Sequence, residues 1–442
     1  MAGRRSANRG WWLEPQGWHR RAGRVNLCQP NSRHLAGFDF RFGRVTGDIR
    51  SAPEPMPTTP SILLVATATK WLGTARIPRG LAKAGFAVSL LIPRNSLAEK
   101  SRYVARIGFL PDGATSAHWF QAFAATVTAT SPRLVVPCDD MAFRLLQALV
   151  LAPPAQFQPT LQLRLAALIR ASLGDPGHYR TSTDKTLLPE AAASLGVSVP
   201  PFAVHTDASD IVAFGETHGW PIVVKRRHGF AGQGVAICKN RNEIERALNV
   251  FAAAEAQERV EPVEGPASYL AQAHLDGSTQ YFQGMAWGGR LLAGYAGEKV
   301  VANPEPTGPP TVTRYFRSPR LRALSERLVA GFGMTGFFVA EFRTDERTQD
   351  VHLIEINRRI SPATHLGAAR NVDFCAALFA AVQGTASTSR ADLAEGESGM
   401  TVYFPGEWLR DPDSRYLREH PVDVPWDEPE LIEAYLALRH EA

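Results

Sequence analysis

Short apolar runs alternate with amphipathic segments in the first part of the chain. Runs with the length of a buried strand occupy residues 62–65, 86–92 and 134–136. Helical spacing is found at residues 75–84, which end at Gly85, and at 141–151. Because strands that alternate with helices are typical of a parallel sheet, the pattern predicts an α/β domain over residues 58–155.

Two polar loops follow strands of this domain, at residues 66–76 and 137–140. Ligands of parallel sheets bind beyond the carboxyl ends of the strands, so both loops are candidate substrate walls. A plain connection between elements explains any single residue there equally well.

Strands outnumber helices between residues 175 and 385, and a helix headed by Asp184 and Lys185 is expected at the start. Strands are expected at 202–204, 222–225, 235–237, 269–273, 279–287, 290–295, 336–342 and 351–356, and helices at 242–251 and 320–332. So many neighbouring strands indicate antiparallel sheet. The pattern therefore predicts an α+β module over 156–385.

The length of 442 residues calls for two or three globular units. After the two units described above, residues 386–442 form a C-terminal tail that begins with a polar linker. A strand at 402–404 and a helix at 431–439 are expected in this tail, and no pattern there indicates chemistry.

Composition is that of a soluble globular protein, with 45% hydrophobic and 21% charged residues. No apolar run approaches the roughly 20 residues that span a membrane. The four cysteines are Cys28, Cys138, Cys238 and Cys375. Their wide spacing indicates neither a metal site nor a disulfide framework, so reduced thiols in a cytoplasmic protein are expected.

Positive charge is confined to the start of the chain. Residues 1–55 contain ten Arg and four acidic residues, a net charge of +6, whereas the whole chain carries +5. Residues 56–442 therefore sum to about −1, which argues against a nucleic-acid-binding body. Residues 1–57 are expected to be a basic, disordered extension. The alternative is that translation starts at Met56, so that residues 1–55 are not part of the protein.

A strand that ends in Lys225 leads into a loop with three glycines, Gly229, Gly232 and Gly234. Glycines let backbone N–H groups close over phosphate oxygens, and the lysine supplies a cation for the same phosphates. A plain hairpin loop is an equally good interpretation of this segment taken alone.

Two predicted strands carry metal-type side chains. Glu355 and Asn357 are two residues apart on a strand, so their side chains point to the same face. Glu341 lies near the end of the strand before it. If the two strands pair, the carboxylates converge, and a pair of acids is stable when a cation lies between them. Carboxylate and amide oxygens are ligands that Mg²⁺ prefers.

Two nucleotide-binding motifs are excluded. The sequence has no Walker A phosphate loop. Residues 331–336 match the glycine pattern of a dinucleotide fold, but they follow a predicted helix and precede a strand, the reverse of the required order. A helix-to-strand turn with glycines at positive φ is expected there.

The ordered set of motifs resembles the ATP-grasp superfamily of carboxylate–amine and carboxylate–thiol ligases, and in particular its biotin-carboxylase-like branch. The set consists of Asp184-Lys185, residues 196–200, residues 221–225 with the glycine loop, residues 272–277, Glu341, and residues 355–359. The resemblance covers about 210 residues. It implies a smaller α/β domain, which residues 58–155 would supply. A two-lobed nucleotide module follows, with its lid subdomain at about 190–270.

The resemblance implies ATP and Mg²⁺ (or Mn²⁺) as cofactors. The implied nucleotide-binding residues are Lys185, Lys225, Gly229, Gly232, Gly234, Gln272, Ala273, His274 and Leu275. The implied metal ligands are Glu341, Glu355 and Asn357, and the implied catalytic residues are Arg359 and Arg314. The adenine hinge departs from the family, which often has Gln-Glu where this chain has Gln272-Ala273, so nucleotide preference stays open.

The expected reaction activates a carboxylate as an acyl phosphate with release of ADP, and an amine then gives an amide or peptide bond. Bicarbonate-dependent carboxylation and non-catalytic ATP sensing are the alternatives. The expected partners are a small carboxylate and a small amine, without nucleic acid or membrane. Many members of the superfamily dimerise, so a homodimer is one of the expected assembly states. Arg358, Arg314 and Arg370 are candidate cations for an amino-acid carboxylate, and His365 is a core histidine or a substrate wall.

Overall fold

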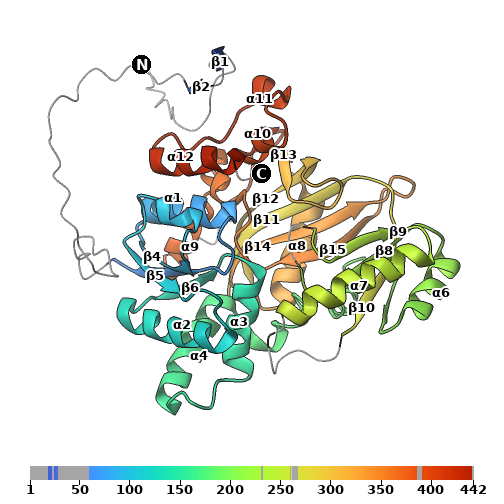
Figure 1. Ribbon diagram of the computed structural model, residues 1–442, viewed down its shortest axis with the longest axis horizontal. Helices are drawn as coiled ribbons and strands as arrows, with labels where there is room; N and C mark the ends of the chain where they lie inside the picture. The colour runs from blue at the N-terminus through green and yellow to red at the C-terminus, as the bar shows by residue number, and fades with distance from the viewer. Residues whose placement is uncertain are drawn as a thin grey trace.

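Three sheets organise the folded body (Figure 1). The computed structural model describes residues 18–21, 24–27, 59–229, 232–258, 260, 267–385 and 391–440. Within these ranges, a parallel sheet, a small antiparallel sheet and a larger antiparallel sheet follow one another along the chain. The predicted combination of an α/β domain and an antiparallel α+β module is confirmed.

The parallel sheet has the order β5-β4-β3-β6. Its strands are β3 (Ser61–Val65), β4 (Ala87–Pro93), β5 (Arg106–Leu110) and β6 (Leu134–Pro137). The helices around it are α1 (Leu72–Ala84), α2 (Ser116–Thr130), α3 (Asp140–Leu151) and α4 (Pro159–Leu173), with short 3-10 turns η1 (Leu97–Lys100) and η2 (Pro176–His178). Strand β3 is buried on both faces: Ile62 and Leu64 pack with α1, whereas Leu63 and Val65 pack with α2, α3 and α4. Two covered faces explain its unbroken apolar run.

The small antiparallel sheet has the order β7-β10-β8-β9. Its strands are β7 (Phe202–His205), β8 (Ile222–Arg226), β9 (Val235–Cys238) and β10 (Tyr269–Ala273). The associated helices are α5 (Leu188–Ser194), α6 (Ala208–His218) and α7 (Arg241–Glu258). The helix expected to begin at Asp184 starts later, because residues 184–187 form a turn in which the Asp184 carboxylate accepts a hydrogen bond from the Thr186 N–H.

The large antiparallel sheet has the order β15-β14-β11-β12-β13-β16. Its strands are β11 (Thr279–Trp287), β12 (Arg290–Ala302), β13 (Pro310–Phe316), β14 (Gly336–Thr344), β15 (Val351–Asn357) and β16 (Ser398–Val402). The remaining helices are α8 (Pro319–Gly331), η3 (Thr364–Arg370), α9 (Phe374–Val382), α10 (Gly406–Arg410), α11 (Tyr416–Glu419), α12 (Pro429–Ala437) and η4 (Leu438–His440). The predicted helix-to-strand turn between α8 and β14 is present, with Gly333 and Gly336 at positive φ.

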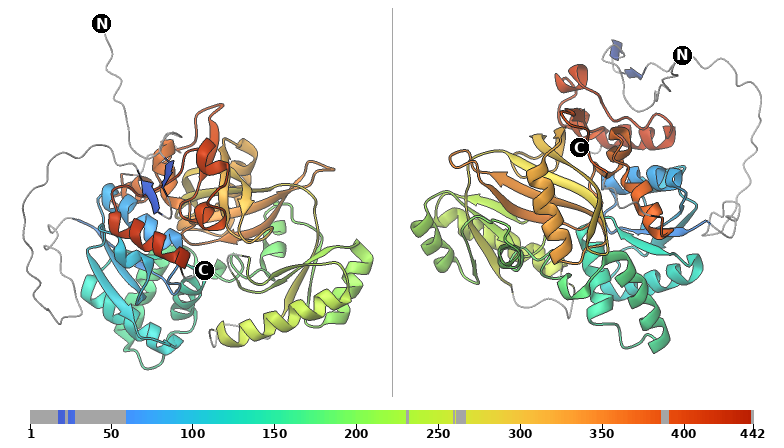
Figure 2. Two further views of the ribbon diagram at one scale, coloured as in Figure 1. Left: turned by 45° about the horizontal axis from the view of Figure 1, so that its top comes forward. Right: turned by 180° about the vertical axis from the view of Figure 1, so that it is seen from behind.

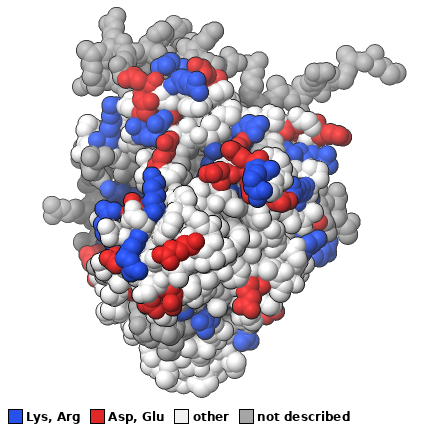
Figure 3. Space-filling view, turned by 90° about the vertical axis from the view of Figure 1, so that its right-hand side faces the viewer, with Lys and Arg blue, Asp and Glu red and all other residues white. Residues whose placement is uncertain are grey.

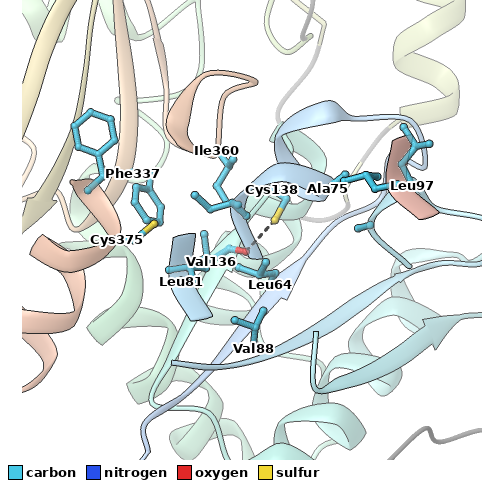
Figure 4. Close-up of a cluster of buried hydrophobic side chains, with 14 of the residues drawn as sticks. Leu64, Ala75, Leu81, Val88, Leu97, Val136, Cys138, Phe337, Ile360 and Cys375 are labelled. Atoms are coloured by element: carbon cyan, nitrogen blue, oxygen red, sulfur yellow. Dashed lines mark hydrogen bonds between the residues drawn. The ribbon is translucent and has the colours of Figure 1, made fainter. Parts of the chain in front are cut away.

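The C-terminal residues pack against the start of the folded body. Figure 2 shows the C-terminal helices beside α1, although most of the chain separates them. Here Arg79 of α1 pairs with Asp427 at 2.5 Å. In the same sense, Ile360 from the large-sheet side packs into the cluster around Leu64 and Cys138 of the parallel domain (Figure 4). The segment around Ile360 therefore lies at the seam between the two parts.

Near the N-terminus, β1 (Trp18–Arg21) and β2 (Arg24–Leu27) form an antiparallel pair. This differs from the expected extension without strands. Other residues of the predicted extension, including Met56, and residues 386–390 of the predicted linker lie outside the described residues. On the face drawn in Figure 3, basic and acidic side chains are interspersed. No described helix has the length and apolarity of a membrane span.

Candidate active site

The antiparallel register of the large sheet brings the predicted metal ligands together. Glu341 of β14 and Glu355 of β15 are direct cross-strand partners. Asn357 lies two residues further along β15, on the same face, and its Nδ2 donates to Glu341 Oε1 at 3.5 Å. The pairing of these two strands, and with it the predicted convergence of the carboxylates, is observed.

Lysines balance the two carboxylates. Lys299 of β12 lies 2.7 Å from Glu341 Oε2, and Lys185 lies 3.3 Å from Glu355 Oε1. Burial by itself would raise the pKa of Glu355, but Lys185, Lys225 and Lys299, with Arg359, hold that pKa below its ordinary value. Burial also lowers the pKa of Lys225 to about 8. The site is therefore a cluster of buried charges of both signs.

Arg359 is held from both sides of the seam. Its Nε donates to the Asp140 carboxylate at 2.9 Å, and its Nη2 donates to Asn357 Oδ1 at 3.1 Å. The guanidinium also stacks 4.7 Å from the ring centroid of Trp71. Trp71 and Asp140 come from the loops after β3 and β6, so the two strand-end loops predicted as substrate walls meet the site at Arg359.

The glycine loop folds over a buried arginine. Gly234 has φ +80°, and a Cβ there would lie 2.4 Å from Cγ of Arg226, so only glycine fits. Gly229 has φ +152° and its carbonyl accepts a hydrogen bond from Lys185 Nζ at 2.8 Å. A Cβ at Gly232 would lie 2.7 Å from the Thr307 carbonyl oxygen of the β12–β13 loop. The loop therefore packs against both Lys185 and the opposite rim of the cavity.

The loop covers a cavity of about 270 Å³. Of the residues predicted to act, those that line it are Lys225, Gly229, Gly232, Gln272, Ala273, His274, Leu275, Glu341, Glu355, Asn357 and Arg359. The predicted hinge is the end of β10 and the residues after it, where Arg343 Nε donates to the Leu275 carbonyl at 2.9 Å. Lys185 reaches the same group of charges through its contacts with Glu355 and Gly229.

Some predicted residues lie elsewhere. Arg314 is not among the cavity residues: its side chain is 53% exposed and pairs with Glu298 at 2.5 Å. Gly234 supports the loop from outside the cavity lining. Arg358 is buried and donates to Ser182 Oγ.

The two remaining candidates for the second substrate are structural in their contacts. Arg370 is buried, donates to the Tyr295 hydroxyl and donates to Thr401 Oγ1 at 2.6 Å. His365 is buried and contacts Asp423 at 2.9 Å, which agrees with the core-histidine interpretation.

Several residues of the site were not predicted from the sequence. Among them are Trp71, Asp140, Gln283, Lys299 and Tyr403, which either line the cavity or contact Arg359. Trp71 and Asp140 lie within loops that the sequence marked as candidate walls. Lys299 and Tyr403 carried no signal, because nothing near them in sequence indicates their neighbours across the sheet.

Comparisons with known proteins support the fold described above. Residues 184–261 match the family model for the carbamoyl-phosphate synthase L chain, ATP binding domain. The biotin carboxylase domain of a 2-oxoglutarate carboxylase from Hydrogenobacter thermophilus superposes with a TM-score of 0.58 and 15% identity, covering 77% of this chain and 73% of that chain. The chain has the ATP-grasp fold. A search of curated proteins finds no match.

Two further ATP-grasp structures have different chemistry in their names. The L-amino acid ligase from Bacillus licheniformis matches with a TM-score of 0.52 and 15% identity, covering 73% of this chain and 74% of that chain. The N5-carboxyaminoimidazole synthetase from Staphylococcus aureus matches with a TM-score of 0.52 and 15% identity, covering 77% of this chain and 81% of that chain. The fold is thus shared by proteins named as a carboxylase, an amino acid ligase and a synthetase, so the fold alone does not identify the reaction.

The donor set in this ATP-grasp fold suits a hard divalent cation. Glu341, Glu355 and Asn357 offer carboxylate and amide oxygens on one sheet face, beside the cavity. Within the described part of the chain, no group of three or more His, Cys, Asp or Glu has metal-binding geometry, so sulfur- or imidazole-rich sites are not seen there. The residues present therefore fit Mg²⁺ or Mn²⁺ better than a softer metal.

Proposed function

We propose that this protein is an ADP-forming ligase that uses Mg-ATP to phosphorylate a carboxylate and then joins the acyl group to an amine. The observation that carries the proposal is one cavity lined by the Glu341–Glu355 pair with Lys225 and Lys299, where Lys185 also pairs with Glu355 from outside the lining. Transfer of a phosphoryl group depends on positioning and charge neutralisation, which such a cluster supplies.

Each part of the cavity has a proposed role. The end of β10 with residues 272–275 receives the adenine, and Lys185 and Lys225 bind phosphate oxygens beneath the glycine loop. Glu341, Glu355 and Asn357 would hold Mg²⁺, which when bound neutralises charge on the phosphates. Arg359 steadies the transferred phosphoryl group, because its guanidinium is fixed and offers several donors in one plane.

The chemistry balances without a redox partner. A carboxylate oxygen attacks the γ-phosphorus, the bond to the ADP oxygen breaks, and an acyl phosphate forms. The amine then attacks the acyl carbon, the amine loses a proton, and phosphate leaves with the oxygen that came from the acid. Water would hydrolyse the acyl phosphate, so closure of the glycine loop against the β12–β13 loop protects it.

A panel assay tests this proposal without knowledge of the amine. Hydroxylamine replaces the amine and converts any acyl phosphate to a hydroxamate, which is measured together with ADP. We expect both products in equal amounts with Mg-ATP and a suitable acid, and neither with Glu355→Gln. ADP release that depends on bicarbonate and gives no hydroxamate would indicate carboxylation instead. ATP binding with no product from any acid would favour the sensor interpretation.

A further inference from the structure

Part of the cavity lining is rich in rings, and it includes Trp71, which stacks on Arg359. Its residues, called the ring wall here, are Trp71, Tyr281, Tyr403, Pro306, Pro309, Pro310 and Pro362, together with Ala363. They come from the parallel domain, the large sheet, the β12–β13 loop, the chain after β15 and the chain after β16. Five separate parts of the chain thus contribute to this lining.

The segment from Ile360 to Ala363 ties this wall together. Trp71 Nε1 donates to the Ile360 carbonyl at 3.1 Å, at the start of the segment. Tyr403 packs in one buried cluster with Ala363 and Leu366, at the end of the segment. The two rings of Trp71 and Tyr403 are therefore held in place by packing and hydrogen bonding.

Three polar side chains at or beside the ring wall make hydrogen bonds within the protein. The Tyr403 hydroxyl lies 2.9 Å from Thr313 Oγ1, and Ser361 Oγ donates to Gln283 Oε1 at 3.2 Å. Gln283 Nε2 donates a hydrogen bond to the Tyr295 hydroxyl. A polar substrate body placed here would find few partners for its own hydrogen-bonding groups, and leaving such groups unpaired is costly.

Charges beside the ring wall are suited to a single carboxylate. Lys299 and Arg359 are the cations next to it, and both lie beside the proposed metal ligands. Among the described cavity residues, the only carboxylates are Glu341 and Glu355. Both are already assigned to the metal, so no described carboxylate there is left to pair with a substrate ammonium.

We infer that the acid activated in this cavity is a monocarboxylate with an apolar, ring-containing body and no free ammonium group. This rests on the proposed function, since it identifies the acid of that same reaction. The carboxylate meets Lys299 and Arg359 while the body packs among the rings of the wall, where aromatic surfaces favour stacked or edge contacts.

Three acids of similar length test the inference in the hydroxamate assay. The probes are 3-phenylpropanoate, phenylalanine (the same skeleton with an ammonium group) and glutarate (a second carboxylate in place of the ring). We expect kcat/KM for 3-phenylpropanoate to exceed that of each of the others by about tenfold or more. Equal or higher values for phenylalanine or glutarate overturn the inference and leave the proposed function intact. No hydroxamate from these or from a broad acid panel overturns the proposed function, and the inference with it.

A matched pair of variants locates the acid on the ring wall. Tyr403→Ala removes one ring, whereas Tyr403→Phe keeps it and removes only the hydroxyl. We expect KM for 3-phenylpropanoate to rise about tenfold with Ala and little with Phe, with Kd for ATP unchanged in both. Unchanged ATP binding also confirms that each variant is folded. Equal KM values for the acid in Tyr403→Ala and wild type would place the substrate elsewhere and refute the inference.

Discussion

Replacing Asp140 with Asn removes the negative charge that faces Arg359 across the seam between the parallel domain and the large sheet. The Arg359 side chain is 6% exposed and that of Asp140 is 26% exposed, so water screens the pair only in part. The contact is 2.9 Å long, and Arg359 keeps its bond to Asn357 and its stacking on Trp71 in the variant. The change therefore loosens the guanidinium without freeing it.

The expected loss follows from these contacts. A hydrogen bond to a charged group contributes about 1.5–3 kcal/mol, and Asn retains an oxygen acceptor, so we expect a loss of about 1–1.5 kcal/mol. If Arg359 acts on the transferred phosphoryl group, this appears as a decrease in kcat of about five- to tenfold, with KM for ATP unchanged. Asp140→Ala, which keeps no acceptor, is expected to lower kcat by about ten- to hundredfold.

The assay is ADP and hydroxamate formation at saturating ATP, in wild type, Asp140→Asn, Arg359→Ala and the double variant. Because Asp140 acts through Arg359, the Asn substitution should change kcat by less than about twofold when Arg359 is already absent. Asp140 also begins α3, so its charge loss is expected to lower the free energy of unfolding by only about 0.3–1 kcal/mol. Fully additive effects on kcat, or a loss seen only in the melting temperature, would refute the positioning role.

Three further changes test other parts of the account. Gly234→Ala forces a Cβ against the Arg226 side chain at positive φ, so we expect a strain of about 1–3 kcal/mol in the glycine loop and a KM for ATP raised about tenfold, measured by ATP titration. Lys299→Met removes the partner of Glu341, and kcat/KM for the acid should fall at least about tenfold while ATP binding with Mg²⁺ changes little. Burial lowers the pKa of His365 to about 4, below its ordinary value of 6.5, so the folded state takes up its proton later than the unfolded state. The free energy of unfolding should therefore fall as pH drops from about 6.5 towards 4, and urea titrations of His365→Gln should lack that part of the decrease.

Local sequence patterns predicted the strands that carry the candidate metal ligands and the position of the glycine loop. The strand period placed Glu355 and Asn357 on one face of a strand, with Glu341 on the strand before it. The observed pairing of β14 with β15 agrees. Glycine spacing located the loop over the cavity, where Gly234 is required by its φ and by the close approach of Arg226.

Contacts between distant parts of the chain could not be predicted in this way. Lys299 of β12 contacts Glu341 of β14 across β11, which lies between the two strands. No local pattern encodes this order of strands. Arg314 was assigned to the site from the family resemblance. Since β13 was not expected, the outward direction of its side chain could not be predicted. Tyr403 reaches the cavity because β16 joins the edge of the large sheet, which a tail without recognised chemistry did not suggest.

Transfer of oxygen from the acid to phosphate tests the central claim most directly. The acid is supplied with ¹⁸O in both carboxylate oxygens, together with Mg-ATP and hydroxylamine, and the released phosphate is analysed by mass spectrometry. Activation of the carboxylate predicts one ¹⁸O in each phosphate released, at the same rate as hydroxamate forms. Unlabelled phosphate would mean that water, and not the carboxylate, attacks ATP, and would contradict the ligase mechanism.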